Sequence, residues 1–428
     1  MNQRRNFLKS TGTAIIGTAV LLLTFSVQPG HASVNKVLKV GLIGCGGRGT
    51  GAAAQALKAD PDAVLSCMAD IFPDYLEESY NNLMMVSPNQ VKVDKTNQFI
   101  GFDAYKKVLD SDVDVVILTT PPAFRPLHFV EAVAAGKHVF CEKPVAVDAP
   151  GVRAVLEAAK KAKEKGLSVV SGFTYIYYFP KRAFFEKIDQ GDIGEVRSIL
   201  TVRNGGGLWY KERKPNWTEM EYQLRNWYYY DWLSGDYIVG MMVHSLDLMS
   251  WALGGQLPLR VTGTGGRQAR TEAKWGNIYD HFAIEYEYPG GVKGIHFSRQ
   301  QQGSSNTNHA EIVGREGDAL IDIGRQSHLI SGQNSWSYEG EKNNPYETQH
   351  EELFAAIRAG KPINEGELMA NSTMLAIIGR MAAYSGQTIS WEDAMRSNLS
   401  LGPKMEDYNW ELVWPVPPVA VPGVTKVL

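Results

Sequence analysis

The sequence predicts an α/β protein with two domains, the first with a parallel, doubly wound sheet and the second an α+β domain with a mainly antiparallel sheet. Three observations lead to this fold class. The chain has 428 residues, which is more than one hydrophobic core usually serves. Apolar strand patterns alternate with helical patterns through the first third of the chain. Strand patterns then dominate the middle of the chain.

The composition is that of an ordinary globular protein, with 44% hydrophobic and 21% charged residues. A net charge of −3 offers no basic surface for nucleic acid. The three cysteines, Cys45, Cys67 and Cys141, are too few and of the wrong parity for a disulfide framework. No Cys/His spacing suggests a metal site, so we expect no metal.

The N-terminus has the features of a twin-arginine export signal. Arg4 and Arg5 precede an apolar run over 14–25, which is shorter than the about 20 residues that a bilayer span needs. Small residues before Ser33 suit cleavage, so we expect a signal peptide over 1–32 and a periplasmic mature protein without a stable membrane span. The alternative is an uncleaved membrane anchor. Twin-arginine export carries folded, cofactor-loaded proteins, which fits the motif that follows.

A glycine-rich turn joins the first strand, over 37–43, to a helix that includes 52–57. In this context the spacing Gly44-x-Gly46-x-x-Gly49 predicts a dinucleotide site. The first glycine permits the tight turn, the second lets the backbone approach a pyrophosphate, and the third lets helix and strand pack closely. The helix N-terminus offers free N–H groups to the phosphates. The residues expected at the cofactor here are Gly44, Cys45, Gly46, Gly47, Arg48 and Gly49.

Asp70 ends the second predicted strand, about 20 residues past the last glycine, where an acidic side chain accepts hydrogen bonds from the adenosine ribose. A carboxylate there repels a 2′-phosphate, so NAD is favoured over NADP. The alternative is that Asp70 only caps a helix. Two further strands, over 113–118 and 137–141, continue the parallel sheet, and ligands bind at the carboxyl ends of such strands. The other expected cofactor residues are Thr120, Pro121, His128, Glu142 and Lys143.

The second domain is predicted from alternating strands and two late helices. The pattern over 282–288 has one packed and one wet face, and Pro-Gly-Gly turns it into a hairpin with 292–299. Further strands are expected over 196–203 and 319–323. The helices are one that holds Leu353 and Ile357 and stops at Gly360, and one over 372–384. The proline-rich segment 414–422 cannot be regular helix, and we expect it along the surface or against a partner subunit.

Three elements together resemble the Gfo/Idh/MocA oxidoreductases: the glycine turn, Thr120-Pro121, and Glu142-Lys143-Pro144 closing a strand. The resemblance covers almost all of the chain after the signal. It implies an NAD(P)-binding Rossmann domain over 33–172 and a substrate-binding and oligomerisation domain over 173–428 with a large, mainly antiparallel sheet. It also implies a small-molecule carbohydrate substrate and a homo-oligomer. The family's lysine at Lys143 touches the nicotinamide end and the substrate hydroxyl, where an ammonium would stabilise an alkoxide. The alternative is a surface lysine before a proline turn.

The resemblance also assigns His244, at the start of a helix, as the general base, a role that suits the near-neutral pKa of imidazole. A satisfied structural histidine is the alternative. Asp247, one turn later, is expected to hold the site rather than react. Family dehydrogenases often place a carboxylate four residues before this histidine, but here that position is Gly240, and Asp236 is too far along the helix to substitute.

The aromatic and polar segment 225–232 suits a carbohydrate, because Trp and Tyr faces stack on sugar C–H surfaces while Arg and Asn bind hydroxyls. A packed loop explains any one of its residues equally well. The residues expected at the substrate are Tyr175, Arg225, Asn226, Trp227, Trp232 and Asp247.

The predicted function is an NAD(P)-dependent oxidoreductase acting on a sugar, glycoside or cyclic polyol. Because a reduced cofactor released outside the cytoplasm is not readily reoxidised, we expect it to be tightly bound and recycled internally. The alternative is an NAD-dependent glycosidase that works through a transient 3-keto sugar. A third hypothesis, a non-enzymatic sugar-sensing relative, rests on the missing carboxylate.

Overall fold

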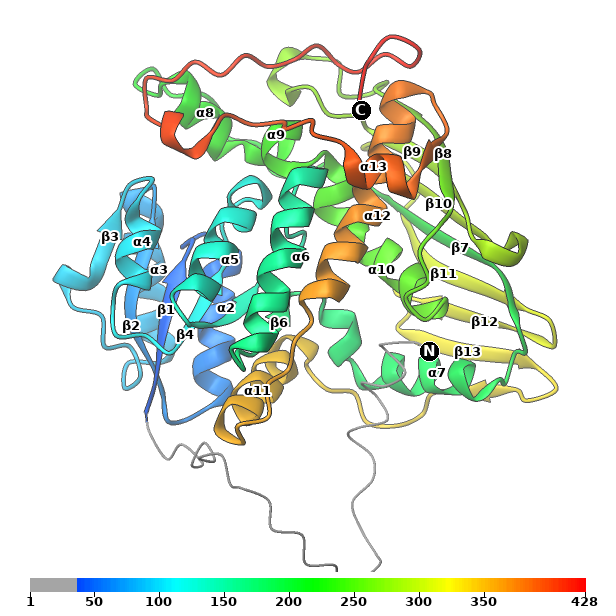
Figure 1. Ribbon diagram of the computed structural model, residues 1–428, viewed down its shortest axis with the longest axis horizontal. Helices are drawn as coiled ribbons and strands as arrows, with labels where there is room; N and C mark the ends of the chain where they lie inside the picture. The colour runs from blue at the N-terminus through cyan, green and yellow to red at the C-terminus, as the bar shows by residue number, and fades with distance from the viewer. Residues whose placement is uncertain (1–36) are drawn as a thin grey trace, which may run out of the picture.

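The structure is a computed structural model, and it describes residues 37–428. The predicted signal peptide over 1–32 lies outside the described residues. Within residues 37–428, no helix combines the length and apolar character that a bilayer crossing requires. The predicted fold class is confirmed: two sheets, one parallel and one mainly antiparallel, lie side by side with helices between them (Figure 1).

The first domain is a six-stranded parallel sheet in the order β3-β2-β1-β4-β5-β6. This is the strand order of the Rossmann fold, in which the chain reverses direction across the sheet between β1 and β4. The strands are β1 (Leu38–Ile43), β2 (Ala63–Asp70), β3 (Gln98–Ile100), β4 (Val115–Leu118), β5 (His138–Cys141) and β6 (Val169–Ser171). The helices are α2 (Gly47–Ala59), α3 (Pro73–Val86), α4 (Ala104–Leu109), α5 (Arg125–Ala134) and α6 (Ala149–Glu164).

The second domain is a nine-stranded sheet in the order β14-β13-β12-β11-β7-β10-β9-β8-β15. Only β7 and β10 pair in parallel; the other neighbours are antiparallel. The strands are β7 (Val196–Gly205), β8 (Arg260–Gly266), β9 (His281–Glu287), β10 (Lys293–Gln300), β11 (Thr307–Gly314), β12 (Gly317–Asp322), β13 (Ser327–Gly332), β14 (Trp336–Ser337) and β15 (Ile389–Ser390).

Helices α7 (Phe179–Gln190), α10 (Val243–Ala252) and α12 (Gly366–Ser385) cover one face of this sheet, the face toward the first domain (Figure 1). The other helices of this part are α8 (Glu219–Arg225), α9 (Asp231–Ser234), α11 (Pro345–Arg358) and α13 (Trp391–Arg396). Helices α11 and α12 return to pack against α2 and α6 of the first domain. The chain therefore crosses between the two sheets more than once.

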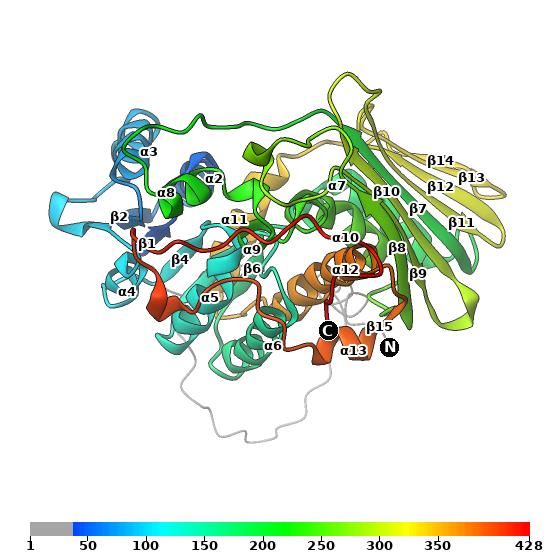
Figure 2. The same ribbon diagram turned by 90° about the horizontal axis from the view of Figure 1, so that it is seen from above.

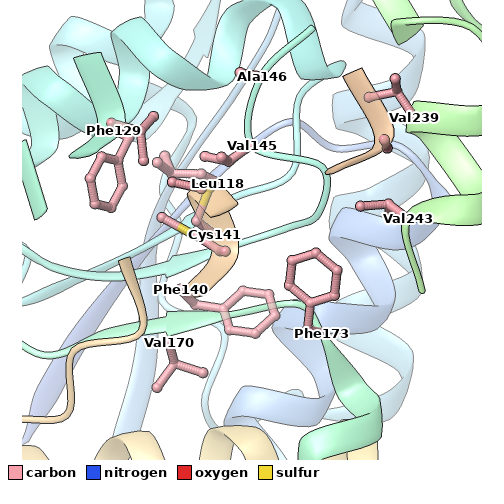
Figure 3. Packing of buried hydrophobic residues seen from close by; sticks show 14 of the residues in the cluster. Leu118, Phe129, Phe140, Cys141, Val145, Ala146, Val170, Phe173, Val239 and Val243 are labelled. Atoms are coloured by element: carbon pink, nitrogen blue, oxygen red, sulfur yellow. The ribbon is translucent and has the colours of Figure 1, made fainter. Parts of the chain in front are cut away.

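One buried cluster joins the two sheets, and Figure 3 shows part of it. It contains Phe140 and Cys141 of β5, Phe173 just after β6, and Val239 and Val243 from the second domain. The three cysteines, all buried, are free thiols. This shared core fixes the carboxyl edge of the first sheet against the start of α10.

The predicted helices and strands are confirmed, with ends that differ by a few residues. One element that the sequence did not reveal stands directly before α10: a π-helical turn, Ile238–Met242 (the π turn). Such turns widen the helix by one residue and frequently occur at functional sites.

The C-terminal residues 397–428 contain one short 3-10 turn, Met405–Asp407, and no longer helix, as expected for the proline-rich end. Seen from above, this tail runs across the first domain and returns to the second (Figure 2). It packs on its own chain: the carbonyl of Ala420 accepts a hydrogen bond from the Tyr279 hydroxyl at 2.8 Å.

Candidate active site

The glycine turn forms a loop, Gly44–Gly49 (the glycine loop), between β1 and α2. Gly44 has a φ of +98°, and a Cβ there would lie 2.7 Å from the Thr120 amide nitrogen, so both conformation and space require glycine. A Cβ at Gly49 would collide with the carbonyl oxygen of Gly44. A Cβ at Gly46 would meet no atom within 4 Å, and the N-terminus of α2 has no side-chain cap. The loop thus leaves open space and uncapped N–H groups where a pyrophosphate would bind.

Asp70 ties this loop to the end of β2. Its carboxylate accepts hydrogen bonds from the amides of Cys45 at 2.6 Å and Phe72 at 2.9 Å. Burial raises the pKa of Asp70 to about 6, while the amide donors act in the opposite direction. The bond to Phe72 resembles the capping role considered above, and the bond to Cys45 shows a loop-anchoring role that the sequence did not reveal. The contact with a ribose stays a prediction.

Thr120 and His128 form a pair at the end of β4. The Thr120 hydroxyl lies 3.2 Å from His128 Nδ1, and the His128 ring lies 4.2 Å from the Tyr105 ring. Burial, and next the Arg125 charge, lower the pKa of His128 to about 3, so the imidazole is neutral. His128 therefore orients the Thr120 hydroxyl through a hydrogen bond and carries no charge that could act on the cofactor.

Glu142 connects the glycine loop to the turn that follows β5. Glu142 is buried, with 4% of the residue exposed. Its carboxylate accepts hydrogen bonds from Arg48 Nε at 2.6 Å and from the Lys143 amide at 3.1 Å. Arg125 Nη1 donates to the Pro144 carbonyl at 2.6 Å and fixes the other side of the turn. Arg48, expected at the phosphates, and Glu142 thus position the loop through their ion pair.

Lys143 reaches from the first domain to the second. Its Nζ donates a hydrogen bond to the carbonyl oxygen of Gly240, in the π turn, at 3.2 Å. Burial lowers the pKa of Lys143 to about 8, opposed by Glu142 and assisted by Arg203. A lysine with such a pKa is protonated at neutral pH and can change charge within the range in which enzymes work.

His244 is the second residue of α10 and lies just past the π turn. Its ring lies 5.1 Å from the Tyr175 ring and meets Phe173 edge-on at 6.0 Å. Within the described part of the chain, His244 Nδ1 has no hydrogen-bond partner. Burial, and next the charges of Lys143 and Arg203, lower its pKa well below 6.5. The imidazole is therefore neutral at physiological pH and able to accept a proton.

The other acidic groups nearby have structural partners. Asp247 is buried in α10 and accepts a hydrogen bond from the Ser372 hydroxyl at 2.7 Å, which joins α10 to α12. Asp236, with φ of +70°, accepts hydrogen bonds from the Tyr279 amide at 2.8 Å and the Tyr384 hydroxyl at 2.6 Å. Asp247 thus joins two helices, and its place at the substrate stays a prediction.

The aromatic segment lies partly outside this arrangement. Arg225 binds Asp74 of α3 through two hydrogen bonds of 2.9 and 3.1 Å. Asn226 is buried and bonds to the backbone of Lys211, and the Trp232 indole donates to Gln223 at 2.8 Å. These three polar groups have protein partners. Trp227 is half-buried against Trp209, with ring centroids 6.2 Å apart, and keeps part of its face accessible.

Two cations of the site were not anticipated, Arg203 on β7 and Lys181 on α7. Arg203 Nη1 lies 3.5 Å from the carbonyl of Met241, the residue after Gly240. Lys181 Nζ lies 4.6 Å from the centroid of the Tyr175 ring. The sequence carried a signal for Arg203, because strand alternation places it on the same face as the apolar Ile199. Among residues 37–428, no group of three or more His, Cys, Asp or Glu side chains could hold a metal ion.

The comparisons with known proteins fit this architecture. The family model described as an oxidoreductase family with an NAD-binding Rossmann fold matches residues 38–171, and that of the GFO/IDH/MocA C-terminal domain matches residues 182–320. Inositol 2-dehydrogenase from Rhizobium meliloti (strain 1021) is 25% identical over 280 residues, which are 65% of this chain and 74% of the relative.

A second relative, 2,7-anhydro-N-acetylneuraminate hydratase from Escherichia coli (strain K12), is 30% identical over 180 residues. This match covers 42% of the chain and 44% of the hydratase. The structure of aldose-aldose oxidoreductase from Caulobacter crescentus, complexed with glycerol, superposes with a TM-score of 0.65 at 19% identity, over 83% of this chain and 100% of that one. Since the two family models cover well over half of the chain, the protein belongs to the Gfo/Idh/MocA oxidoreductase family, with an NAD-binding Rossmann domain and the family's C-terminal domain.

Proposed function

We propose that the protein is an NAD-dependent oxidoreductase that acts on a CH–OH group of a sugar, glycoside or cyclic polyol and recycles a tightly held cofactor. The observation that carries the proposal is the pairing of Lys143 with the π turn, one helical turn before His244. It brings an ammonium and a neutral imidazole together at the carboxyl edge of the first sheet, where the glycine loop also lies.

The residues divide the chemistry between them. The glycine loop would hold NAD, which would supply the hydride acceptor for the C–H bond, and the carbonyl of a second carbohydrate would be the final hydride acceptor. His244 accepts the hydroxyl proton, because its lowered pKa leaves the imidazole neutral. Lys143 stabilises the negative charge that develops on the same oxygen. The carbon loses a hydride and the oxygen a proton, and the product is a ketone.

Retention of the cofactor is supported by an aromatic cluster that we call the clasp: Phe72, Phe102 and Phe124 of the first domain with Tyr408 and Trp410 of the tail. Ring centroids of Trp410 lie 4.9 Å from Phe102 and 5.6 Å from Phe72, and those of Tyr408 and Phe124 are 5.1 Å apart.

The three phenylalanines follow β2, β3 and β4, at the edge where the adenosine half of a dinucleotide binds. The Arg225–Asp74 bridge reinforces the clasp, since the Arg225 guanidinium also lies 4.0 Å from the centroid of the Phe72 ring. A nucleotide under this cover would dissociate only when the tail and the second domain move away.

A second candidate is an NAD-dependent glycosidase. The reaction would oxidise C3 of the sugar, eliminate the aglycone, add water and return the hydride, so that no outside electron acceptor is needed. Two observations favour it: glycine instead of a carboxylate at position 240, and the relative named as a hydratase of an anhydro sugar. Export by the twin-arginine route and homo-oligomerisation are further proposals, and a periplasmic location would favour either form of internal recycling.

The decisive experiment starts with purified protein. Denaturation should release about one nicotinamide cofactor per chain, and protein that releases none contradicts tight retention. The loaded protein is then incubated with a panel of sugars and glycosides, and the products are identified by mass spectrometry. A ketosugar supports the oxidoreductase, whereas a free sugar of unchanged oxidation state supports the glycosidase.

The Lys143→Ala variant tests the site directly. Loss of the ammonium should lower kcat by at least about 100-fold, because removal of one donor to a developing oxyanion has effects of that size. The released nicotinamide per chain serves as the control and should be unchanged. Retained turnover would contradict the role of Lys143 in either reaction.

A further inference from the structure

Arg203 occupies a position at which a charged side chain is unexpected. In strand β7, Ile199, Thr201 and Arg203 point to the same face, since side chains alternate along a strand. Ile199 and Thr201 are buried against the helices that cover the sheet. Arg203 therefore extends from the core side of the sheet toward the end of the strand, where its guanidinium approaches Met241 of the π turn.

Within residues 37–428, neither the Arg203 nor the Lys143 side chain forms an ion pair, although the charge of Glu142 acts on Lys143 from a longer distance. In the part of the chain that the structure describes, no carboxylate lies within ion-pair distance of either side chain. Their hydrogen bonds go to two successive backbone carbonyls, Lys143 to Gly240 at 3.2 Å and Arg203 to Met241 at 3.5 Å. By contrast, Arg48 pairs with Glu142 in the same region. The π turn thus holds two cations beside His244 without neutralising them.

A third cation lies along the same wall of the site. Lys181 is 3% exposed, and its Nζ lies 3.3 Å from His328 Nε2. Burial lowers the pKa of His328 to about 3, so this neighbour carries no charge. The ammonium also lies against Tyr175, whose ring is the neighbour of His244. Among residues 37–428, Lys181 likewise has no carboxylate within ion-pair distance.

Uncompensated cations in a half-buried site repel one another and favour an anion. Burial is the main cause of the lowered pKa values of Lys143 and His244, and the charge of Arg203 lowers both further. A guanidinium presents a planar fork that matches a carboxylate through two parallel hydrogen bonds. An anionic ligand group would supply the counter-charge that the protein does not provide.

We propose that the substrate is an acidic sugar, whose carboxylate binds Arg203 while its reacting hydroxyl lies between Lys143 and His244. This inference rests on the proposed function for the reacting hydroxyl, but the carboxylate contact is a binding property with its own measurement. The anion could also be the phosphate of a sugar phosphate. The planar fork of a single arginine favours a carboxylate, and the test includes both.

The experiment measures binding to the NAD-loaded protein by calorimetry, with matched pairs that differ only at C6. The pairs are D-glucuronate with D-glucose and D-galacturonate with D-galactose, and D-glucose 6-phosphate is the phosphate arm. At least one acid should bind about tenfold or more tightly than its neutral partner, the effect expected of a charged hydrogen bond. If no acid binds more tightly than its neutral partner, or only the phosphate does, the inference is overturned.

Variants of Arg203 assign the effect. Arg203→Met should remove the preference for the acid, and Arg203→Lys, which keeps the charge but loses the fork, should retain part of it. The matched control is Arg197→Met, which removes an exposed arginine from the other end of β7, where it pairs with Glu195 at 3.1 Å. Loss of the preference in Arg197→Met, or its survival in Arg203→Met, contradicts the assignment.

The two hypotheses fail separately. An acid preference without formation of a ketosugar, or of a free sugar from a glycoside, would leave the carboxylate contact standing and reject the proposed reaction. Turnover of neutral sugars, with no acid preference in binding, would support the reaction and reject the carboxylate contact.

Discussion

The Lys143 ammonium donates its hydrogen bond to the main-chain oxygen of Gly240, and not to a side-chain carboxylate. In dehydrogenases of the family, the position that matches Gly240 often carries the carboxylate of an acid–base pair. The backbone carbonyl keeps the geometry of a partner but supplies no full negative charge. The site therefore has one titratable group fewer than a Lys–carboxylate–His arrangement. The consequences of this difference for the pH dependence can be measured.

Gly240→Asp should restore the charge. A Cβ at Gly240 would lie 3.6 Å from Tyr228 Cε2 and 3.7 Å from the Ser234 carbonyl, which are ordinary contact distances. An anion beside Lys143 favours the protonated amine, so the alkaline limb of the kcat/KM profile should move up by about one pH unit. Gly240→Asn adds the same volume without the charge. An equal shift in both variants would mean that the charge is not its cause.

The wild-type enzyme should have a broad pH optimum for oxidation. Activity needs neutral His244, whose pKa is lowered well below 6.5, so the acid limb should lie below that pH. Activity also needs protonated Lys143, whose pKa is about 8, so kcat/KM should fall above that value. The measurement is kcat/KM against pH with the cofactor bound. An alkaline limb near the ordinary lysine value of 10.5 would contradict the burial of Lys143.

Trp410→Ala should loosen the cofactor. The indole packs against Phe102 and Phe72, and the loss of two such ring pairs should raise the dissociation constant of NAD about tenfold. The readout is the nicotinamide content after gel filtration. Trp336→Ala removes a similarly half-buried indole from β14, at the far edge of the large sheet, and should leave the content unchanged. Equal losses would indicate general destabilisation.

Arg225 distinguishes a sugar contact from a structural bridge. If the bridge to Asp74 is its main role, Arg225→Met and Asp74→Asn should both weaken cofactor retention, with little change in the KM for the sugar. Asp74 lies on α3, so its replacement tests the bridge without altering the aromatic segment. A large rise in the KM for Arg225→Met alone would support the substrate role predicted from the sequence.

The fold and the cofactor edge were predictable because local patterns encode them. Gly49 is required by its contact with the carbonyl oxygen of Gly44, five residues earlier, and Gly44 by its positive φ within the turn. Such local constraints can be recognised in a short motif. The position of Lys143 followed from the strand that it closes. Because the strands are parallel, their carboxyl ends lie at one edge of the sheet. The long connections between the strands do not alter this placement.

The substrate side was less predictable because it depends on contacts between distant segments. Arg225 and Trp232 lie in a segment rich in sugar-binding residue types, and the structure places Arg225 against Asp74 of α3 and Trp232 against the tail. Composition cannot distinguish an aromatic side chain that stacks on a sugar from one that packs on another ring. Arg203 was missed for the same reason, since its role depends on the π turn and α10, which lie next to β7 only in the folded chain.

The clasp also bears on the order in which the protein is assembled. Chains are synthesised from the N-terminus, and domains generally fold as units during synthesis. The glycine loop and its sheet therefore exist before Tyr408 and Trp410 have been made. A nucleotide can enter while the edge is still bare, and the last segment to be synthesised then closes over it. Loading is in this sense an event of biosynthesis, and a chain that completes its tail without a nucleotide must reopen the clasp to acquire one.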